Sequence, residues 1–166
     1  EMSLREVNIP LKEIEYLKSG SYIYICDRWL KLSYDDEYRI AYTKDPFFLS
    51  LGFEKSGDYY KLYLSRESVY EFTAIRKYVY CIFCGGKYTP NQVVKNGKIL
   101  LFPDIDTQIH ILGFRDKGEH YIEISYDKFI SEVTDIWEER TPIEGFKFDV
   151  EPIVYLKKDG VWLVEE

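Results

Sequence analysis

Hydrophobic and polar residues alternate over two short stretches of the chain, residues 59–64 and 121–125. Strict alternation places every second side chain on the same side of an extended backbone, which is the pattern of a half-buried β-strand. Each stretch follows a glycine, Gly57 or Gly118, of the kind found in tight turns between strands. The alternation therefore predicts two strands, each entered through a turn.

Aromatic stretches predict further strands, because Tyr and Phe favour pleated, half-buried surfaces. The end of the chain predicts a closing hairpin, in which Asp159-Gly160 forms the turn between residues 153–156 and 161–164. The aromatic stretches are residues 22–26, 78–83 and 146–150.

A different spacing follows Asp127, where apolar residues recur at intervals of one, three and four positions. This spacing predicts a helix that begins at Asp127 as its N-cap and ends before Pro142. By analogy, residues 65–76 and 10–18 are interpreted as two more helices, and residues 46–51 and 106–112 as helical turns. The apolar residues of the stripe are Phe129, Ile130, Val133, Ile136 and Trp137.

The chain also contains an internal similarity. Leu51-Gly52-Phe53 recurs as Leu112-Gly113-Phe114, and the same offset of 61 residues gives 8 identical positions among the 27 from 51 to 77. Self-similarity at a fixed period indicates a duplicated supersecondary unit. We therefore expect two tandem repeats.

The expected fold class is α+β with a mostly antiparallel sheet. Each repeat, roughly 60 residues long, would contain a helix, a β-hairpin, a turn and a strand. A C-terminal helix and β-hairpin would close the fold. The first repeat, with an N-terminal helix, is expected over residues 1–76, the second over 77–140 and the closing hairpin over 141–166, all in one compact globule.

Composition adds an aromatic and acidic character. Aromatic residues make up 17% of the 166 residues, 16 of them tyrosines, and the formal net charge is −7. Because no cluster of Lys and Arg is present, the sequence predicts no nucleic-acid binding. No apolar run is long enough for a membrane span, and the charged first residues do not read as a signal peptide. Three cysteines make no disulfide framework, so a cytoplasmic location is expected.

Cys81 and Cys84 are the sharpest chemical candidates, because two cysteines at this spacing before a glycine pair form half of a zinc knuckle. Further ligands could come only from His110, His120 or Cys26. A redox-active pair is a second interpretation, and two small residues on a strand entering a turn is the simpler one.

Catalytic motifs are otherwise missing from the sequence. Two histidines leave little for acid–base chemistry, and neither a Gly-x-Ser-x-Gly elbow nor a glycine-rich phosphate loop occurs. We therefore predict no enzyme activity and no cofactor.

Two groups of residues are candidates for binding a protein partner. The first is the acidic run Asp35, Asp36 and Glu37. The second is Trp137 with Glu138 and Glu139, where acids at the end of the expected helix oppose its dipole and would form an exposed patch for a basic partner.

With Leu51-Gly-Phe53 and Trp137-Glu-Glu-Arg-Thr-Pro142, this acidic, tyrosine-rich chain resembles bacterial toxin-immunity proteins in general character. The resemblance implies a protein that binds and blocks a toxin, often a basic nuclease, by complementary charge, and it assigns no residue roles. The expected function is a non-enzymatic protein-binding module with an acidic, tyrosine-rich face. The alternatives are a metal or redox protein centred on Cys81 and Cys84, and a domain that binds a peptide or small ligand.

Overall fold

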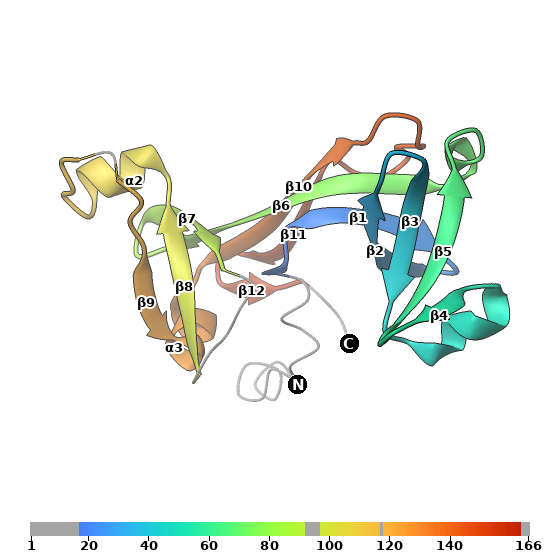
Figure 1. Cartoon of the computed structure of the whole chain (residues 1–166). Helices are drawn as coiled ribbons and strands as arrows, with labels where there is room; N and C mark the ends of the chain where they lie inside the picture. Colours follow the sequence, from blue (N-terminus) through green and yellow to red (C-terminus); the bar gives the residue numbers. More distant parts are fainter. Residues whose placement is uncertain (1–16, 92–96, 117, 164–166) are drawn as a thin grey trace. The chain divides into compact units, whose positions relative to one another are not determined.

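The computed structural model describes residues 17–91, 97–116 and 118–163 (Figure 1). Strands contain 51% of these residues and short helices 16%, and nearly all strand pairs are antiparallel. The expectation of an α+β fold made of two helix-and-hairpin repeats is therefore wrong, because the chain has a largely β fold.

Two compact units make up the chain, and each is assembled from segments that are distant in sequence. Unit 2 comprises Gly20–Lys77 and Arg140–Glu151. Unit 1 comprises Glu1–Ser19, Tyr78–Glu139 and Pro152–Glu166, of which residues 1–16, 92–96, 117 and 164–166 lie outside the described part.

Unit 2 is built on an antiparallel sheet whose strands lie in the order β6, β1, β2, β3, β5, β4. One side of this sheet carries the core, which includes Ile23, Leu30, Leu32 and Ala41 together with Phe48. The strands are β1 (Gly20–Ile25), β2 (Arg28–Tyr34), β3 (Tyr38–Thr43), β4 (Glu54–Ser56), β5 (Tyr59–Ser65) and the first half of β6 (Thr73–Phe83).

A 3₁₀ turn, η2 (Pro46–Leu51), follows β3 and supplies a large side chain to that core. Phe48 is fully buried, and its ring centre lies 5.1 Å from that of Phe53, just beyond Gly52. Gly52 adopts φ 93°, a left-handed conformation that other residues rarely take, so the glycine allows the chain to turn back toward the sheet.

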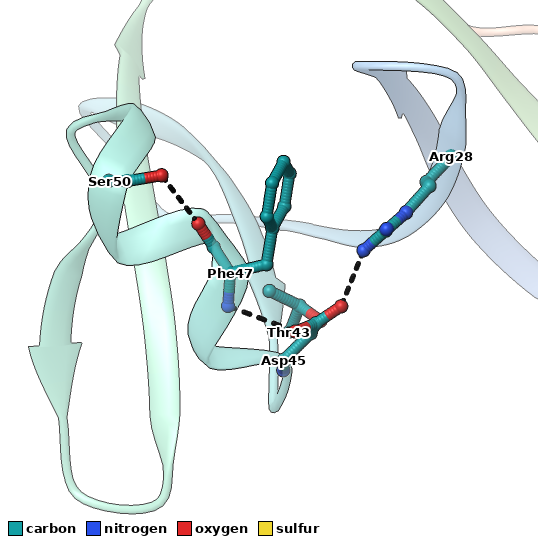
Figure 2. A network of polar contacts seen from close by, with 5 residues as sticks. All are labelled: Arg28, Thr43, Asp45, Phe47 and Ser50. Carbon is teal, nitrogen blue, oxygen red and sulfur yellow. Dashed lines mark hydrogen bonds and ion pairs between the residues drawn. The ribbon is translucent and has the colours of Figure 1, made fainter.

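Figure 2 shows the polar contacts that fix the start of η2. The Asp45 carboxylate accepts a hydrogen bond from the Phe47 amide at 2.9 Å. The backbone amide of Asp45 donates to Thr43 Oγ1 at 3.1 Å. The guanidinium group of Arg28 contacts the same carboxylate at 2.5 Å and lies 4.7 Å from the Phe47 ring centre. Asp45 therefore acts as an N-cap that also ties η2 to β2.

Replacing Asp45 with alanine is expected to lower the free energy of unfolding by about 1 kcal/mol, chiefly through loss of the N-cap. The exposed ion pair with Arg28 adds little to this loss. Urea denaturation of Asp45→Ala beside Glu67→Ala, an exposed acid outside any cap, measures the effect. Equal stabilities for the two variants would refute the capping role.

Unit 1 contains the second half of β6 and a second core, in which Val79, Cys81 and Phe129 are fully buried. In this unit β6 pairs with β7, β7 with β8 and β8 with β9, while β10 pairs with β11 and β11 with β12. Its further elements are β7 (Gly86–Pro90), β8 (Lys98–Pro103), α2 (Ile105–His110), β9 (Ile122–Ser125), α3 (Tyr126–Glu132), most of β10 (Asp135–Pro142), β11 (Ile153–Lys158) and β12 (Val161–Trp162).

The helix expected to run from Asp127 to just before Pro142 is much shorter than predicted. α3 ends at Glu132, and Val133 already has an extended backbone with ψ 135°. Ser125 rather than Asp127 is the N-cap, since its side chain accepts a hydrogen bond from the Lys128 amide. β-Branched residues beyond Val133 favour a strand, so the apolar stripe spans a helix and the start of β10.

The helix expected over residues 65–76 is also wrong. Only Val69–Glu71 form a 3₁₀ turn, and the 11-residue strand β6 begins at Thr73. Along β6 every second residue from Ile75 to Phe83 is buried, a period of two that belongs to a strand. No strand forms over residues 146–150, where only a bridge between Lys147 and Thr73 occurs.

Other predictions from the sequence are confirmed. The strands at 59–64 and 78–83 fall within β5 and β6, the turn at 46–51 is η2, and the closing hairpin is formed by β11 and β12. The strand at 22–26 corresponds to β1, and the turn at 106–112 overlaps α2. The helix predicted at 10–18 lies almost entirely outside the described residues.

Candidate functional site

Most tyrosines of unit 2 lie on the side of the sheet opposite the core; Tyr60, which packs against the core, does not. The register pairs Lys31 with Tyr42 and Ile40 with Tyr63, so these side chains share one side of β2, β3 and β5. All positions on this side from β2 outward remain exposed or half-buried. We call this surface the tyrosine face; it comprises Tyr24, Trp29, Lys31, Ser33, Tyr38, Ile40, Tyr42, Tyr59, Lys61 and Tyr63.

The two sides of the same strands differ sharply in burial. Leu30, Leu32 and Ala41 alternate with the tyrosine face along β2 and β3, and all three are buried. Near β6, the side of the sheet that carries the tyrosines is no longer exposed, because Tyr22 and Ile75 are buried there. The open area therefore lies over β2, β3 and β5, which run side by side in Figure 1.

Ring contacts hold the aromatic side chains of the tyrosine face in place. The ring centres of Tyr38 and Tyr63 are 5.7 Å apart with planes at 80°, and those of Tyr42 and Tyr59 are 5.5 Å apart at 76°. This edge-to-face geometry is favourable for aromatic pairs. Because the rings support one another, less rotamer entropy is lost when a partner covers them.

Tyr24 and Trp29 form a third pair, with ring centres 5.0 Å apart. The guanidinium carbon of Arg140 lies 5.5 Å from the Trp29 ring centre, within cation–π range. The Tyr24 hydroxyl donates to Asp27 Oδ1 at 3.4 Å, and partial desolvation together with this carboxylate raises the pKa of Tyr24.

The charges on the tyrosine face are mostly positive. Lys31 and Lys61 stand on either side of Tyr42 in the register, one on each neighbouring strand. Adjacent strands are about 4.8 Å apart, so the two lysine-bearing strands are separated by about 10 Å. Glu54 opposes Lys61 at the β4 edge, and Lys44 lies 5.3 Å from the Tyr59 ring centre. The expected combination of tyrosines with acids on one face therefore does not occur here.

The acidic run predicted as a partner site forms the turn between β2 and β3. Asp35 Oδ1 accepts hydrogen bonds from the amides of Tyr38 at 2.6 Å and Glu37 at 2.9 Å, and these two bonds lower the pKa of Asp35. The backbone oxygen of Asp36 accepts a bond from Arg66. Asp35 thus shapes the turn, while the carboxylates of Asp36 and Glu37 are exposed.

The second predicted acidic patch is not an exposed helix end. Trp137, Glu138 and Glu139 lie on β10, and only 4% of Glu138 is exposed, so its predicted place in a surface patch is wrong. Trp137 Nε1 donates to Glu139 Oε2 at 3.0 Å, and its ring lies near Tyr80 and Tyr155. Strand alternation turns Glu138 inward, while Trp137 and Glu139 lie half-buried on the other side of β10.

The structure places Cys81 and Cys84 in different environments, one buried on β6 and the other exposed in the turn that follows. Cys81 is fully buried, and desolvation raises its pKa to about 12, so its thiol stays protonated. Cys84 is exposed in the turn between β6 and β7, with φ 50°. Within the described residues no cluster of three or more His, Cys, Asp or Glu side chains could hold a metal ion.

The two histidines are each placed beside an acid. His120 stacks on Phe114 at 3.9 Å between ring centres and lies 3.1 Å from Asp116 Oδ1. His110 on α2 is 3.7 Å from Asp106 Oδ1. Both pairs are local contacts of the kind expected at a protein surface.

Sequence reasoning missed the tyrosine face because it did not identify β2 and β3. The signal is present: Leu30 and Leu32 alternate with Trp29 and Lys31, and the next strand begins at Tyr38. Alternation within one strand shows two sides, but only the register between strands shows which residues assemble into one surface.

Comparison with protein-family models, with curated proteins and with solved structures finds no significant match for this chain. In the described part, no helix has the length and apolar character needed to cross a membrane.

Proposed function

We propose that this protein is a non-enzymatic protein-binding module and that its tyrosine face contacts the partner. The proposal rests on one observation: the side chains on the two sides of the same sheet differ in burial. One side of β2 and β3 is closed over a core, while the other presents six aromatic side chains across β1, β2, β3 and β5 without burying any of them.

Such a surface has the properties of a protein interface. Tyr and Trp are enriched among the residues that dominate binding energy, and they offer a large contact area at modest entropic cost. The partner is expected to place acidic side chains over Tyr42, where Lys31 and Lys61 approach from both neighbouring strands.

An immunity-type inhibitor is one form of such a module. A basic toxin, as the sequence suggests, would have to meet acids outside the tyrosine face, for example Asp36 and Glu37 in the adjoining turn. A partner with an acidic patch fits the tyrosine face itself better.

Single-stranded nucleic acid is a weaker fit for the same surface. Such ligands need a positively charged groove and ring faces on which bases can stack. Here Glu54 opposes Lys61, one of only two lysines on the face, and the tyrosine rings of two pairs already meet edge to face. The chain as a whole carries a net charge of −7, which repels a polyanion at long range.

Affinity capture from native lysate tests the proposal with two matched variants. Tyr63→Ser removes an exposed ring of the tyrosine face, whereas Tyr70→Ser removes a still more exposed ring on η3, 65% against 41%. We expect Tyr70→Ser to retain the protein partner and Tyr63→Ser to weaken its capture at least tenfold, because central aromatic residues act as hot spots.

A charge-reversal variant provides a second test in the same capture experiment. Lys31→Glu is expected to weaken capture further, whereas Lys55→Glu on β4 serves as the control for a general change in charge. Undiminished capture by both Tyr63→Ser and Lys31→Glu, or recovery of nucleic acid in place of protein, would overturn the proposal.

A further inference from the structure

The short helix α2 of unit 1 has its polar and apolar sides reversed. Its most buried residues are polar, Thr107 at 2% and Gln108 at 8% exposure. Its isoleucines face solvent instead: Ile105 is 60% exposed, Ile109 50% and, just past the helix, Ile111 47%. An exposed cluster of large apolar side chains beside buried polar ones is unusual in a soluble protein.

Polar contacts explain why α2 keeps this orientation. Thr107 Oγ1 accepts a hydrogen bond from the Lys87 amide at 2.9 Å, and Gln108 Nε2 donates to the Pro103 carbonyl at 3.3 Å. The Asp104 side chain accepts from the Thr107 amide at 2.8 Å as N-cap. The helix is thus attached to unit 1 through its polar side, which leaves the isoleucines free of the core.

The three isoleucines follow one another along α2 and its exit, with the exposed Asp106 between the first two. Ile105 and Ile109 are four residues apart and so neighbour each other on α2. The loop after α2 folds back on it, because the amides of Leu112 and Phe114 donate to the carbonyls of Thr107 and Gln108. We call Ile105, Ile109 and Ile111 the isoleucine surface.

In the segment of the chain that carries the isoleucine surface, acids outnumber bases. Residues 104–120 contain four acids, Asp104, Asp106, Asp116 and Glu119, and two bases, Arg115 and Lys117, the last of which lies outside the described residues. The carboxylates of Asp106 and Asp116 are largely exposed. A ligand suited to this surface must present apolar side chains flanked by positive charge.

We infer that the isoleucine surface binds a basic amphipathic helix of a partner protein. Leucine-like side chains of the helix would cover Ile105 and Ile109, and its lysines or arginines would face Asp106 and Asp116. This helix-in-groove type of recognition uses apolar anchors spaced three and four residues apart. The site is independent of the tyrosine face and carries the opposite charge, so the protein would bind two chemically different partner segments.

A fluorescein-labelled 14-residue helical peptide of leucine and lysine, titrated by fluorescence anisotropy, serves as the probe. We expect saturable binding that weakens at least tenfold in Ile109→Ser and severalfold in Asp106→Asn, with a reduced salt dependence in the latter. Ile153→Ser, a similarly exposed isoleucine on β11, is the matched control and should bind as the unaltered chain does. Circular dichroism confirms that each variant is folded.

Three outcomes would overturn the inference. The first is equal binding of a leucine–glutamate peptide of the same pattern, and the second is unchanged binding by Ile105→Ser and Ile109→Ser. The third is weaker probe binding in Tyr63→Ser, which would place the peptide on the tyrosine face. Conversely, loss of the partner in Tyr63→Ser with intact probe binding supports both surfaces separately.

Discussion

Replacement of Phe48 by alanine is expected to lower the free energy of unfolding of unit 2 by about 3–5 kcal/mol, the usual cost of truncating a fully buried phenylalanine. Phe48 is wholly inaccessible to solvent and belongs to the core formed by Ile23, Leu30 and Ala41. Its removal leaves a cavity under β2 and β3 that the short turn η2 cannot refill.

Phe47→Ala is the matched control for this loss. Phe47 is the neighbouring residue of η2 but is exposed, with Arg28 over its ring. Its truncation removes a contact worth about 1 kcal/mol and opens no cavity. Denaturant unfolding followed by near-ultraviolet circular dichroism compares the two variants. Equal losses in stability would show that η2 does not cover the core as described.

The stability of the protein is expected to decline at alkaline pH because of Cys81. Desolvation raises the pKa of this buried thiol from 9.0 to about 12, which means that the folded state keeps the proton. Above pH 9 the unfolded chain releases that proton and is thereby stabilised. The contribution of Cys81 is therefore complete below pH 9 and falls by roughly 1 kcal/mol per pH unit until about pH 12.

Urea denaturation between pH 8 and pH 10.5 measures this dependence. Cys81→Ala should be less stable at pH 8, because truncation leaves a small cavity. It should lose less stability on going to pH 10.5, because it lacks the thiol while its tyrosines are unchanged. Cys84→Ala, in the exposed turn, should follow the unaltered protein. A Cys81→Ala curve parallel to that of the unaltered chain would contradict the buried, protonated thiol.

Prediction from sequence succeeded where one local signal decides the structure. Residues 46–51 form η2 as predicted because Asp45, Pro46 and Gly52 supply a cap, a helix start and a left-handed exit in close succession. Asp159 and Gly160, both with positive φ, likewise fix the closing hairpin.

Prediction failed where the spacing of apolar residues fits both the period of a helix and the period of a strand. The apolar residues from Phe129 to Ile136 satisfy a helical spacing, yet α3 stops at Glu132 and Ile136 belongs to β10. Extended pairing of Ile136 with Lys157 of β11 prevails over the local helical pattern. Such pairing joins residues far apart in the chain, so no local window contains it.

Of the candidate site, the sequence predicted only the abundance of tyrosine and not which residues lie on one surface. The excess of tyrosine predicted an aromatic surface, but the acids were assigned to it without knowledge of the register. The structure instead places Lys31 and Lys61 beside Tyr42, turns Glu138 inward and uses Asp35 to shape a turn. Net charge describes the whole chain and does not predict the charge of one face.

Site-specific photo-crosslinking tests the role of the tyrosine face most directly. A benzoylphenylalanine placed at position 63 samples what lies against this face in cells, while the same group at position 70 samples the exposed turn η3. We predict a discrete crosslinked protein from position 63 and none from position 70. Absence of any protein adduct at position 63, or identical adducts at both positions, would contradict a binding role for this face.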